Sequence, residues 1–551
     1  MEINPKQSAS FVARTLQNKE SKQPPAEDTA TVKAKARVIF SFWSVVLFLG
    51  LPLWLWTTSI HRANLPVQEM LAWANGKACE VDVPLLFDIK APKLTHSEAQ
   101  DIIRGTSHAI SSSKNFDIQR VQWQLSETLD GPRSRNSEEV ALSIEFLEDS
   151  SSSAPIAQLL LQSKTLLVQY SPAMLRSNFG VYSVDIGKVI GEKLDEIFVE
   201  EQLSIEYLLA SYSGCNKQLS RFSSTGNNAD HFELSAKQAR RRTRSLKYAP
   251  TYHISISLFT PGPVPTSWDI EAAISEYLLP LLESYSISNF TVDTQLQLYA
   301  PFSPSMRSPE FDWIKQQWII REEDLGGFMD TANWPLSPNI GAGPTLNFIL
   351  YVPDESLRPL VINGSGDHSW IIPQWGGVSI LNHVGRIPTI LSKEHLRPVL
   401  LTFSRQLLSL LGASDNPTSF PQQLQMLTRI HTLSLILSAS STLGSLAQLA
   451  ESLATIPIPE EVALRVTRAL DHLQMAQRNS HAGRFRSALE YARLAKAEAE
   501  KAFFEKDMVS QVYFPDEHKV AVYLPLLGPI GVTLLASLFK EIKKRRPTKS
   551  Q

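Results

Sequence analysis

The chain has 551 residues, of which 43% are hydrophobic and 20% are charged, and its formal net charge is -2 at pH 7. This composition is too apolar for an intrinsically disordered chain, and a chain of this length usually divides its core among two or three units. The near-neutral charge excludes any composition-based argument for a nucleic acid partner or another strongly charged ligand of the whole body.

The first 56 residues predict a tail followed by a membrane span. Residues 1–37 are polar and lack sustained periodicity, so we expect a mobile tail. Residues 38–56 read VIFSFWSVVLFLGLPLWLW, which is nineteen uncharged residues with tryptophans placed like interfacial anchors. A cleaved signal peptide is the alternative, but its apolar part has only about 7 to 15 residues and starts closer to the N-terminus. We therefore expect a retained transmembrane helix.

Residues 57–215 are predicted to form a first lobe of helices and sheet. The stretch HSEAQDIIRGTSHAISS has apolar residues at helical spacing, and helical spacing returns from Val189 to Ser211. Between them, the segments IQRVQWQL, VALSIEFL and TLLVQYS are rich in β-branched or alternating apolar residues, which is typical of strands. Helices packed beside a sheet are the simplest assembly.

A polar insert follows at residues 216–248 and ends with a basic cluster. The cluster contains Arg240, Arg241, Arg242, Arg244 and Lys247. An anionic partner such as lipid headgroups is one interpretation. We favour a solvated loop, because runs of charge are usually exposed to solvent.

Residues 249–391 repeat the pattern of strand and helix and predict a second αβ lobe. The expected strands are TYHISISLF, VDTQLQLYA, LNFILYVP and SWIIPQW, and the expected helix is SWDIEAAISEYLLPLLESY. The resemblance between the two lobes is one of order only, and we identify no internal sequence repeat.

From residue 392 to residue 519 helical patterns replace strand patterns. One helix is expected from Pro459 to Arg478, and a second has an apolar face formed by Phe485, Ala488, Leu489, Ala492, Ala495, Ala499 and Phe503. The two helices should pack as a pair. The fold class expected from the whole chain is therefore a mixed α/β ectodomain, with two lobes and a C-terminal helical pair, between two membrane anchors.

Residues 520–539 predict a second transmembrane helix, and residues 540–551 a basic tail. The twenty residues carry no charge and would span about 30 Å as a helix, which matches the hydrocarbon core of a bilayer. Lysines and arginines gather after this span, and Lys33, Lys35 and Arg37 precede the first one. Because basic residues resist translocation, both termini should be cytoplasmic and the segment between the spans should lie on the lumenal or extracellular side.

The second span contains Pro525, Gly528, Pro529 and Gly531. We expect these residues to bend or partly unwind the helix, and irregular backbone in a membrane is tolerated mainly where neighbouring protein satisfies it. This favours contact with partner helices. A simple kinked anchor is an equally good interpretation, since proline and glycine are ordinary in such helices.

The segment between the spans contains two sequons and both cysteines, which are consistent with an oxidising compartment. Asn289 and Asn363 begin N-glycosylation sequons, although short sequons also occur by chance. Cys79 and Cys215 are the only cysteines, so a disulfide is one reading of them and buried free thiols are the other.

No arrangement of residues makes a convincing catalytic, cofactor or metal site. Ser365, Asp367 and His368 crowd together, but triad members normally come from separate parts of a chain, so a polar turn is the better interpretation. A cysteine nucleophile with His253 as its base has no protease signature around it. The acidic run at residues 322–324 is explained equally well by an exposed turn.

Four segments resemble a known family. They are FPDEHKVAVYLPLLGPIGVTLL from Phe514 to Leu535, LPLWLWTTSIHRANLP at the first span, NFTVDTQLQLYAP from Asn289 to Pro301, and IPQWGGVSI from Ile372 to Ile380. Their order and spacing cover nearly all of the chain after residue 38. On these segments the chain resembles the PIG-S family, a subunit of the complex that attaches glycosylphosphatidylinositol (GPI) anchors to proteins in the endoplasmic reticulum.

The resemblance implies a non-catalytic role beside a separate cysteine-protease-like subunit that performs the transamidation. It also implies the two-span topology, the sequon at Asn289, an endoplasmic reticulum location and no catalytic residue, cofactor or metal in this chain. The partners it implies are the other transamidase subunits and membrane lipid. A membrane-tethered hydrolase is the rival hypothesis, and a transporter is poorly supported because two spans without internal charges offer no pathway.

Overall fold

The computed structural model describes residues 28–545 with short gaps and divides the chain into two compact units. The terminal unit is formed by residues 1–64, 453–460 and 504–551, and the body by residues 65–452 and 461–503. Most of the predicted N-terminal tail and of the polar insert lie outside the described residues. The gaps are residues 51, 54–55, 57–61, 113–115, 117–118, 127–138, 150–153, 161–162, 173–180, 216–235, 237–238, 240, 242, 286–287, 301–306, 327–342, 414–418, 454–455, 507 and 509–515.

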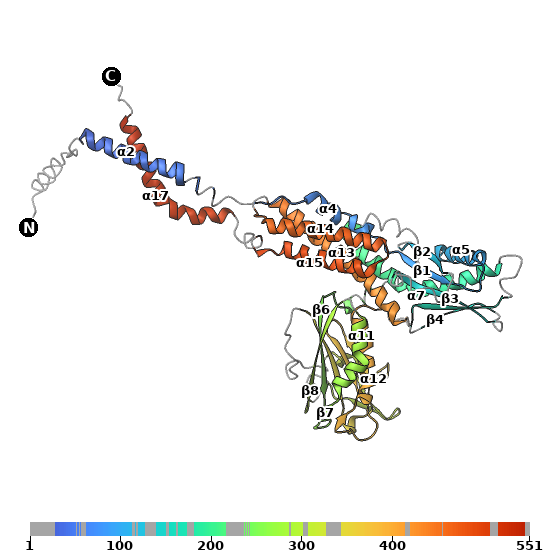
Figure 1. The fold of residues 1–551 in the computed structure, drawn as a ribbon. Helices are drawn as coiled ribbons and strands as arrows, with labels where there is room; N and C mark the ends of the chain where they lie inside the picture. Colours follow the sequence, from blue (N-terminus) through green and yellow to red (C-terminus); the bar gives the residue numbers. More distant parts are fainter. Residues whose placement is uncertain are drawn as a thin grey trace, which may run out of the picture. The chain divides into compact units, whose positions relative to one another are not determined.

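In the terminal unit the two ends of the chain are helical. Helix α2 (Thr29–Val45) continues into a π-helical turn, η1 (Val46–Gly50), and α17 runs from Asp516 to Arg545. The two helices contact each other, as Figure 1 shows. Within the same unit, the amide of Ala63 donates a hydrogen bond of 2.8 Å to the carbonyl of Ile458. The described residues of both predicted spans thus lie in helices.

The first sheet of the body has five strands in the order β2-β1-β3-β5-β4. All neighbouring strands are parallel except β4, which is antiparallel to β5. Helix α5 (His96–Ser112) connects β1 to β2, and α7 (Val181–Ser211) follows β5. The strands are β1 (Leu85–Lys90), β2 (Val121–Ser126), β3 (Val140–Glu148), β4 (Ile156–Leu159) and β5 (Thr165–Tyr170).

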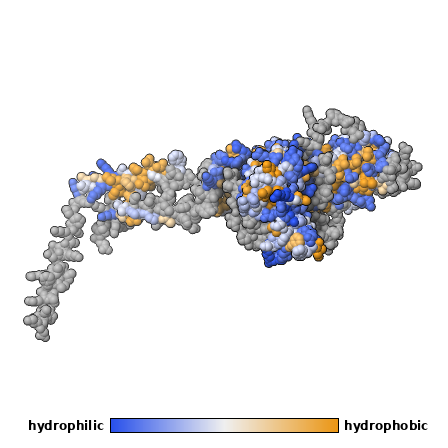
Figure 2. Space-filling model, turned by 90° about the horizontal axis from the view of Figure 1, so that it is seen from below, coloured by the Kyte–Doolittle hydropathy of each residue, from blue (hydrophilic) through white to orange (hydrophobic). Residues whose placement is uncertain are grey.

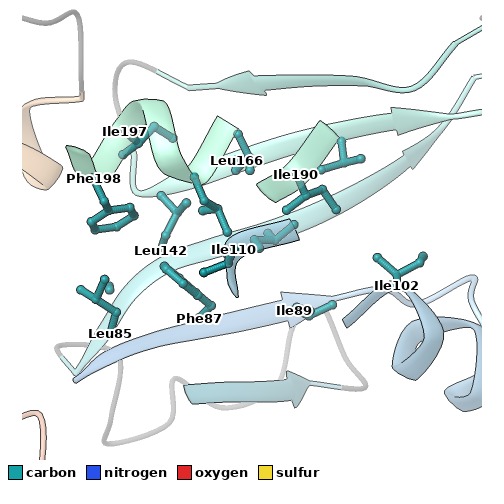
Figure 3. Close-up of a cluster of buried hydrophobic side chains, with 14 of the residues drawn as sticks. Leu85, Phe87, Ile89, Ile102, Ile110, Leu142, Leu166, Ile190, Ile197 and Phe198 are labelled. Atoms are coloured by element: carbon teal, nitrogen blue, oxygen red, sulfur yellow. The ribbon is translucent and has the colours of Figure 1, made fainter. Parts of the chain in front are cut away.

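The register of this sheet places its apolar side chains on one face. Phe87 lies opposite Trp123 on β2 and next to Leu142 on β3, and Ile144 lies opposite Leu166 on β5. Because side chains alternate along each strand, these residues share the face that α5 and α7 cover (Figure 3). The opposite face is more polar and carries the ion pair between Lys90 and Glu145 at 3.1 Å.

The second sheet has the order β13-β14-β11-β6-β8, and only β13 is antiparallel to its neighbour. The central strands β6, β11 and β14 are almost entirely buried, which is typical of parallel strands covered on both faces. The strands are β6 (Thr251–Phe259), β8 (Asn289–Gln297), β11 (Thr345–Tyr351), β13 (Ser369–Ile372) and β14 (Gly376–Ile380).

Different elements cover the two faces of the second sheet. On one face α12 (Lys393–Leu410) packs, with the rings of Phe348 and Phe403 at 5.1 Å. On the other lies a small sheet of β9 (Glu310–Asp312), β10 (Gln317–Ile320) and β12 (Leu360–Ile362), which shares a core with Ile349 and Tyr351. Short elements complete this part: β7 (Ser267–Trp268) paired with β15 (Ile390–Leu391), then α10 (Ile270–Ala273), the π-helical turn η5 (Ile274–Leu278) and α11 (Leu279–Ser284).

The two glycines of the segment IPQWGGVSI are required by close packing. Gly376 has a φ of +155° and a Cβ there would lie 1.8 Å from the carbonyl oxygen of Asn347. A Cβ on Gly377 would lie 2.2 Å from Oε1 of Gln406 on α12. Gln406 can therefore reach the sheet, where its Nε2 donates to the carbonyls of Trp370 and Val378 at 3.0 and 3.2 Å.

The rest of the body is helical and is arranged around α13 (Phe420–Ser452), which contacts α4 (Val67–Ala74), α7 and α15 (Phe485–Phe503). Helix α14 (Glu460–His481) lies along α15, with Arg465 3.6 Å from Glu498 and the rings of His472 and Tyr491 6.0 Å apart. The expected mixture of sheets and helices is thus confirmed.

Among the residues that the structure describes, α13 is the one helix long and apolar enough to cross a membrane, with a mean hydropathy of 1.3 in its most apolar window. However, 61% of that window is buried inside the body, so α13 serves as a core helix. In α17 the apolar segment Gly531–Lys540 is too short to cross a membrane by the same criterion. Residues 38–56 are described only in part.

Candidate functional site: a body built around one helix, and apolar terminal helices

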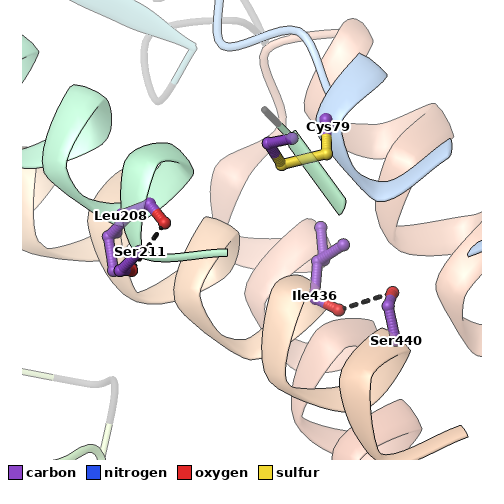
Figure 4. The surroundings of a disulfide bond; sticks show 6 residues. Cys79, Leu208, Ser211, Ile436 and Ser440 are labelled. Carbon is purple, nitrogen blue, oxygen red and sulfur yellow. Dashed lines mark hydrogen bonds between the residues drawn. A yellow bond between two sulfur atoms is a disulfide. The ribbon is translucent and has the colours of Figure 1, made fainter. Parts of the chain in front are cut away.

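The structure joins Cys79 and Cys215 by a disulfide, a pairing that the sequence left open. Cys79 lies in η2 (Lys77–Glu80), just after α4, and Cys215 ends η4 (Ser213–Cys215), just after α7. The bond therefore ties the beginning of the body to the end of the first α/β part, across 136 residues of sequence (Figure 4). A crosslink closing a loop of that length stabilises a fold by about 5 kcal/mol in the chain-entropy model.

The disulfide also removes one catalytic hypothesis. A sulfur held in a disulfide is not a thiolate, so the hypothesis of a cysteine nucleophile at Cys79 or Cys215 is wrong for this structure. His253, which was considered as its base, instead lies on β6 with its Nδ1 2.5 Å from Oγ1 of Thr291.

Helices α4 and α13 approach closely beside the disulfide. A Cβ on Gly444 of α13 would lie 2.4 Å from the Cβ of Ala74, the last residue of α4. A Cβ on Gly214, next to Cys215, would lie 2.3 Å from the carbonyl oxygen of the same Ala74. Small residues on α13 and η4 thus allow three separate chain segments to meet at one point.

Two adjacent glutamates of α7 bind two distant arginines inside the body. Arg429 of α13 donates from Nε and Nη2 to the two carboxylate oxygens of Glu201, at 2.6 and 2.7 Å. Arg241 donates from Nη1 to Oε2 of Glu200 at 2.7 Å. All four side chains are at most 5% exposed. Since a charge buried without its partner is strongly unfavourable, these pairs fix which segments meet along α7.

The position of Arg241 corrects the expectation for the basic cluster. The sequence favoured a solvated loop over an anionic partner, but the Arg241 side chain is 3% exposed and is held by Glu200. Arg240 and Arg242 lie outside the described residues. A count of charges along the chain cannot show that one member of a basic run is paired inside the body, because its partner is 41 residues away.

Helix α13 buries its hydroxyl groups without leaving them unpaired. Thr428, Thr432 and Ser440 each donate a side-chain hydrogen bond to the carbonyl four residues earlier, at 2.7 to 2.8 Å. Figure 4 shows the bond from Ser440 to Ile436. Such bonds satisfy a hydroxyl within its own helix, which explains how a helix with many Ser and Thr residues can form the centre of the body.

The terminal helices carry large apolar side chains on their surface. Val38, Phe40, Phe48 and Leu49 of α2 and η1 are between 66% and 76% exposed, and Val532 and Phe539 of α17 are 66% and 67% exposed. Figure 2 shows this apolar surface on the helices of the terminal unit. Single exposed apolar residues are normal on a protein, but a group of them along a helix is typical of contact with lipid or with another protein.

The prolines and glycines of α17 were expected to bend or partly unwind the helix. The helix is continuous from Asp516 to Arg545 with Pro525 and Pro529 inside it, so a bend at these residues stays a prediction. Each proline removes a single backbone N–H, and the remaining turns keep the helix intact. Gly528 and Gly531 have nothing within 4 Å of a Cβ, so their surfaces are open within the described chain.

Both sequons are accessible. Asn289 begins β8, the edge strand of the second sheet, and its side chain is exposed. Asn363 is exposed in the turn between β12 and β13, where Gly364 has a φ of +86°. Glycan attachment at either asparagine is sterically open, but it stays a prediction.

The other polar clusters lie in exposed turns. Ser365, Asp367 and His368 follow Asn363, and the amide of Asp367 donates a hydrogen bond to Oγ of Ser365 at 3.2 Å. The acidic run at residues 322–324 forms the short helical turn η6 (Glu322–Asp324). Neither cluster has the buried, mutually bonded geometry of a catalytic site.

Comparison with known proteins finds similarity over most of the chain. The family model for "Phosphatidylinositol-glycan biosynthesis class S protein" matches residues 41–548. The chain is 27% identical over 566 residues to the "GPI-anchor transamidase component PIGS" of Bos taurus, covering 94% of this chain and 96% of that protein. It is 26% identical over 538 residues to the "GPI transamidase component GPI17" of Saccharomyces cerevisiae, covering 92% and 91% of the two chains.

A third relative, the "GPI transamidase component PIG-S homolog" of Schizosaccharomyces pombe, is 30% identical over 313 residues, covering 54% of this chain and 55% of that protein. The match of the family model includes the end of α2, the whole body and α17. The chain therefore belongs to the phosphatidylinositol-glycan biosynthesis class S (PIG-S) family.

Proposed function

We propose that this protein is a non-catalytic subunit of a GPI transamidase and that it supports the attachment of GPI anchors to proteins in the endoplasmic reticulum. The observation that carries the proposal is the full-length match to relatives that are named as transamidase components. The cysteines also support it, since both form a disulfide and neither provides a thiolate nucleophile. The catalytic cysteine then belongs to another subunit of the complex.

The proposed topology has two transmembrane helices, one at each end of the chain. Residues 38–56 and 520–539 span the membrane, both termini are cytoplasmic, and the body lies in the lumen. The exposed apolar side chains of α2, η1 and α17 support this arrangement, as do the basic residues that flank them. The endoplasmic reticulum lumen is oxidising, which agrees with the disulfide and with the open sequons.

In this proposal the body is a docking platform for the other lumenal subunits. Its parts are held together by the disulfide, by the close contact of α4 with α13 and by the paired charges on α7. A membrane anchor at each end would keep the platform near the membrane surface and raise its effective concentration for partners in the same membrane.

Within the membrane, we propose that the segment containing Pro525, Gly528, Pro529 and Gly531 contacts helices of partner subunits. Small and flat surfaces let helix backbones approach closely in lipid. The change of Pro525 and Pro529 to leucine should therefore weaken co-purification with partners and leave the melting temperature of the body unchanged. Changing the exposed Val532 to leucine is the matched control. Full co-purification of the double variant would reject this contact.

The function is tested by affinity purification of the full chain in mild detergent, followed by mass spectrometry of the bound proteins. We expect the remaining transamidase subunits to be recovered in comparable amounts. Recovery of the chain alone, or with proteins of unrelated membrane complexes, would contradict the proposed function.

A further inference from the structure

The body contains a cleft of about 630 Å³ between α13, α15 and the N-terminal ends of β3 and β5. This volume is within the range of about 300 to 1,000 Å³ that is usual for small-molecule sites. Leu424, Phe485 and Leu489 contribute an apolar part of its wall. Arg429, whose pair with Glu201 helps to hold the proposed platform together, also lines this cleft.

The wall of the cleft is strongly basic, although the whole chain has a net charge of -2. Its cationic side chains are Lys164, Arg429, Arg484, Arg486 and Arg493, and its carboxylates are Glu139 and Glu490. Concave surfaces focus the field of such charges, so an anion inside the cleft interacts with several cations at once.

Arg429 is a buried part of this wall whose position is fixed by hydrogen bonds. Its side chain is 2% exposed and its Nε and Nη2 are held by Glu201, which fixes the plane of the guanidinium group. These bonds leave the Nη1 amino group for another acceptor, and the residue lines the cleft. The ring of Phe485 lies 5.8 Å from Cζ of Arg429 and further restricts its position. A fixed guanidinium group binds a ligand with little loss of side-chain entropy.

Arg493 is held by a neutral partner. Tyr248 lines the same cleft and bonds to Arg493, and burial raises the pKa of Tyr248 even though Arg493 lowers it. The phenol therefore keeps its proton at neutral pH and does not cancel the charge of the arginine. Its ring also lies 5.6 Å from that of His431 on α13, which holds the tyrosine in place.

We propose that this cleft binds a phosphate-bearing small molecule or headgroup, with the phosphate between Arg429, Arg484 and Arg493. Guanidinium groups match phosphate oxygens in geometry and are favoured over other cations where phosphate is recognised. Even when Glu201 is counted against Arg429, cations outnumber carboxylates around the cleft, which favours a multiply charged phosphate over a single carboxylate. The apolar wall at Phe485 and Leu489 contacts the rest of the ligand.

The proposal is tested by calorimetric titration of the purified full chain in non-ionic detergent with inorganic phosphate, glycerol 3-phosphate and acetate. We expect the phosphate probes to bind, acetate to bind at least about tenfold more weakly, and affinity to fall with added salt. Absence of phosphate binding overturns the proposal, and so does equal binding of acetate, which would indicate a site for peptide carboxylates.

Two variants locate the binding. Arg484→Gln changes an exposed side chain and Arg493→Gln a half-buried one, and each should weaken phosphate binding by about tenfold. Arg478→Gln, on the exposed surface of α14, is the control and should bind as the unchanged protein does. If Arg493→Gln lowers the melting temperature, its weaker binding could come from unfolding, and the affinity of Arg484→Gln alone tests the site. Undiminished binding by Arg484→Gln rejects the cleft as the site.

The source of the phosphate is decided by titration in the same detergent micelles, because the terminal helices would attach the chain to any vesicle. Binding of micelle-dispersed phosphatidic acid, lost in Arg484→Gln and absent with phosphatidylcholine, indicates a lipid headgroup. Binding of glycerol 3-phosphate without binding of phosphatidic acid indicates a soluble phosphorylated compound. Both results support the phosphate site, and neither needs a partner subunit, so a failure of the proposed transamidase function leaves this test intact.

Discussion

Arg429 is buried in the first third of the core helix α13, where a charge is unfavourable unless it is paired. Its partner Glu201 is 228 residues away in sequence and belongs to α7. Gln119 adds a third bond by donating from Nε2 to Oε1 of Glu201 at 3.0 Å. This small network connects α13 to the first sheet of the body through residues whose burial no local pattern reveals.

Removing one member of the Arg429–Glu201 pair should destabilise the body severely. Arg429→Met leaves the Glu201 carboxylate buried without its counter-charge, and we expect a loss of about 3 to 5 kcal/mol in the free energy of unfolding. The double variant Arg429→Met with Glu201→Gln should recover part of the loss. The measurement is thermal unfolding of the full chain in detergent. A single variant as stable as the unchanged protein would show that the pair carries no structural role.

Tyr252 predicts how stability depends on pH in the alkaline range. Burial raises the pKa of Tyr252 to about 12, and its hydroxyl donates to the carbonyl of Lys247 at 3.0 Å. Since the pKa is higher in the folded than in the unfolded state, its contribution to stability is complete below about pH 10 and is lost as the pH rises toward 12.

The Tyr252→Phe variant should therefore lose less stability between pH 10 and 12 than the unchanged protein. Unfolding midpoints measured at intervals across that range provide the comparison. Identical pH profiles of the two proteins would show that Tyr252 titrates in the same way in both states.

At the scale of elements, the contact of α13 with α4 depends on the absence of a side chain at Gly444. A Leu there would collide with Ala74, so Gly444→Leu should lower the free energy of unfolding by about 1 to 3 kcal/mol or more. Ser445→Leu, one residue further and exposed, is the matched control and should have little effect. Thermal unfolding compares the two. Equal melting temperatures would mean that α4 moves aside freely.

Most elements could be predicted from the sequence because their patterns are local. Helix α5 coincides with the stretch HSEAQDIIRGTSHAISS, and β6 with TYHISISLF. The exceptions have tertiary causes. Ser267 and Trp268 were expected to begin a helix but pair with β15, 123 residues later, so the helix starts at Ile270.

The candidate site was less accessible to prediction than the elements. Which cysteines and charges meet depends on how α4, α7 and α13 pack, and the sequence holds no periodic signal for that. The signal that could have been used is a charged residue in an apolar setting. Glu200 and Glu201 follow a run of apolar positions in α7, and Arg429 interrupts another in α13. Such residues require partners, although the sequence does not name them.

At the scale of the whole molecule, the chain has an apolar helix near each end and a body that is stabilised by a disulfide and by buried ion pairs. The terminal helices expose apolar side chains, whereas the apolar helix α13 hides them inside the body. This difference in burial, rather than hydropathy, distinguishes a helix suited to lipid from a core helix. Under the proposed topology the body and its basic cleft face the lumen together.

The central claim is tested most directly by adding protease to sealed microsomes that contain the full chain with a distinct epitope tag at each terminus. The account predicts that both tags are removed and that a fragment containing the body, residues 65–503, survives until detergent opens the membrane. Digestion of the body in sealed microsomes, with the two tags spared, would contradict it.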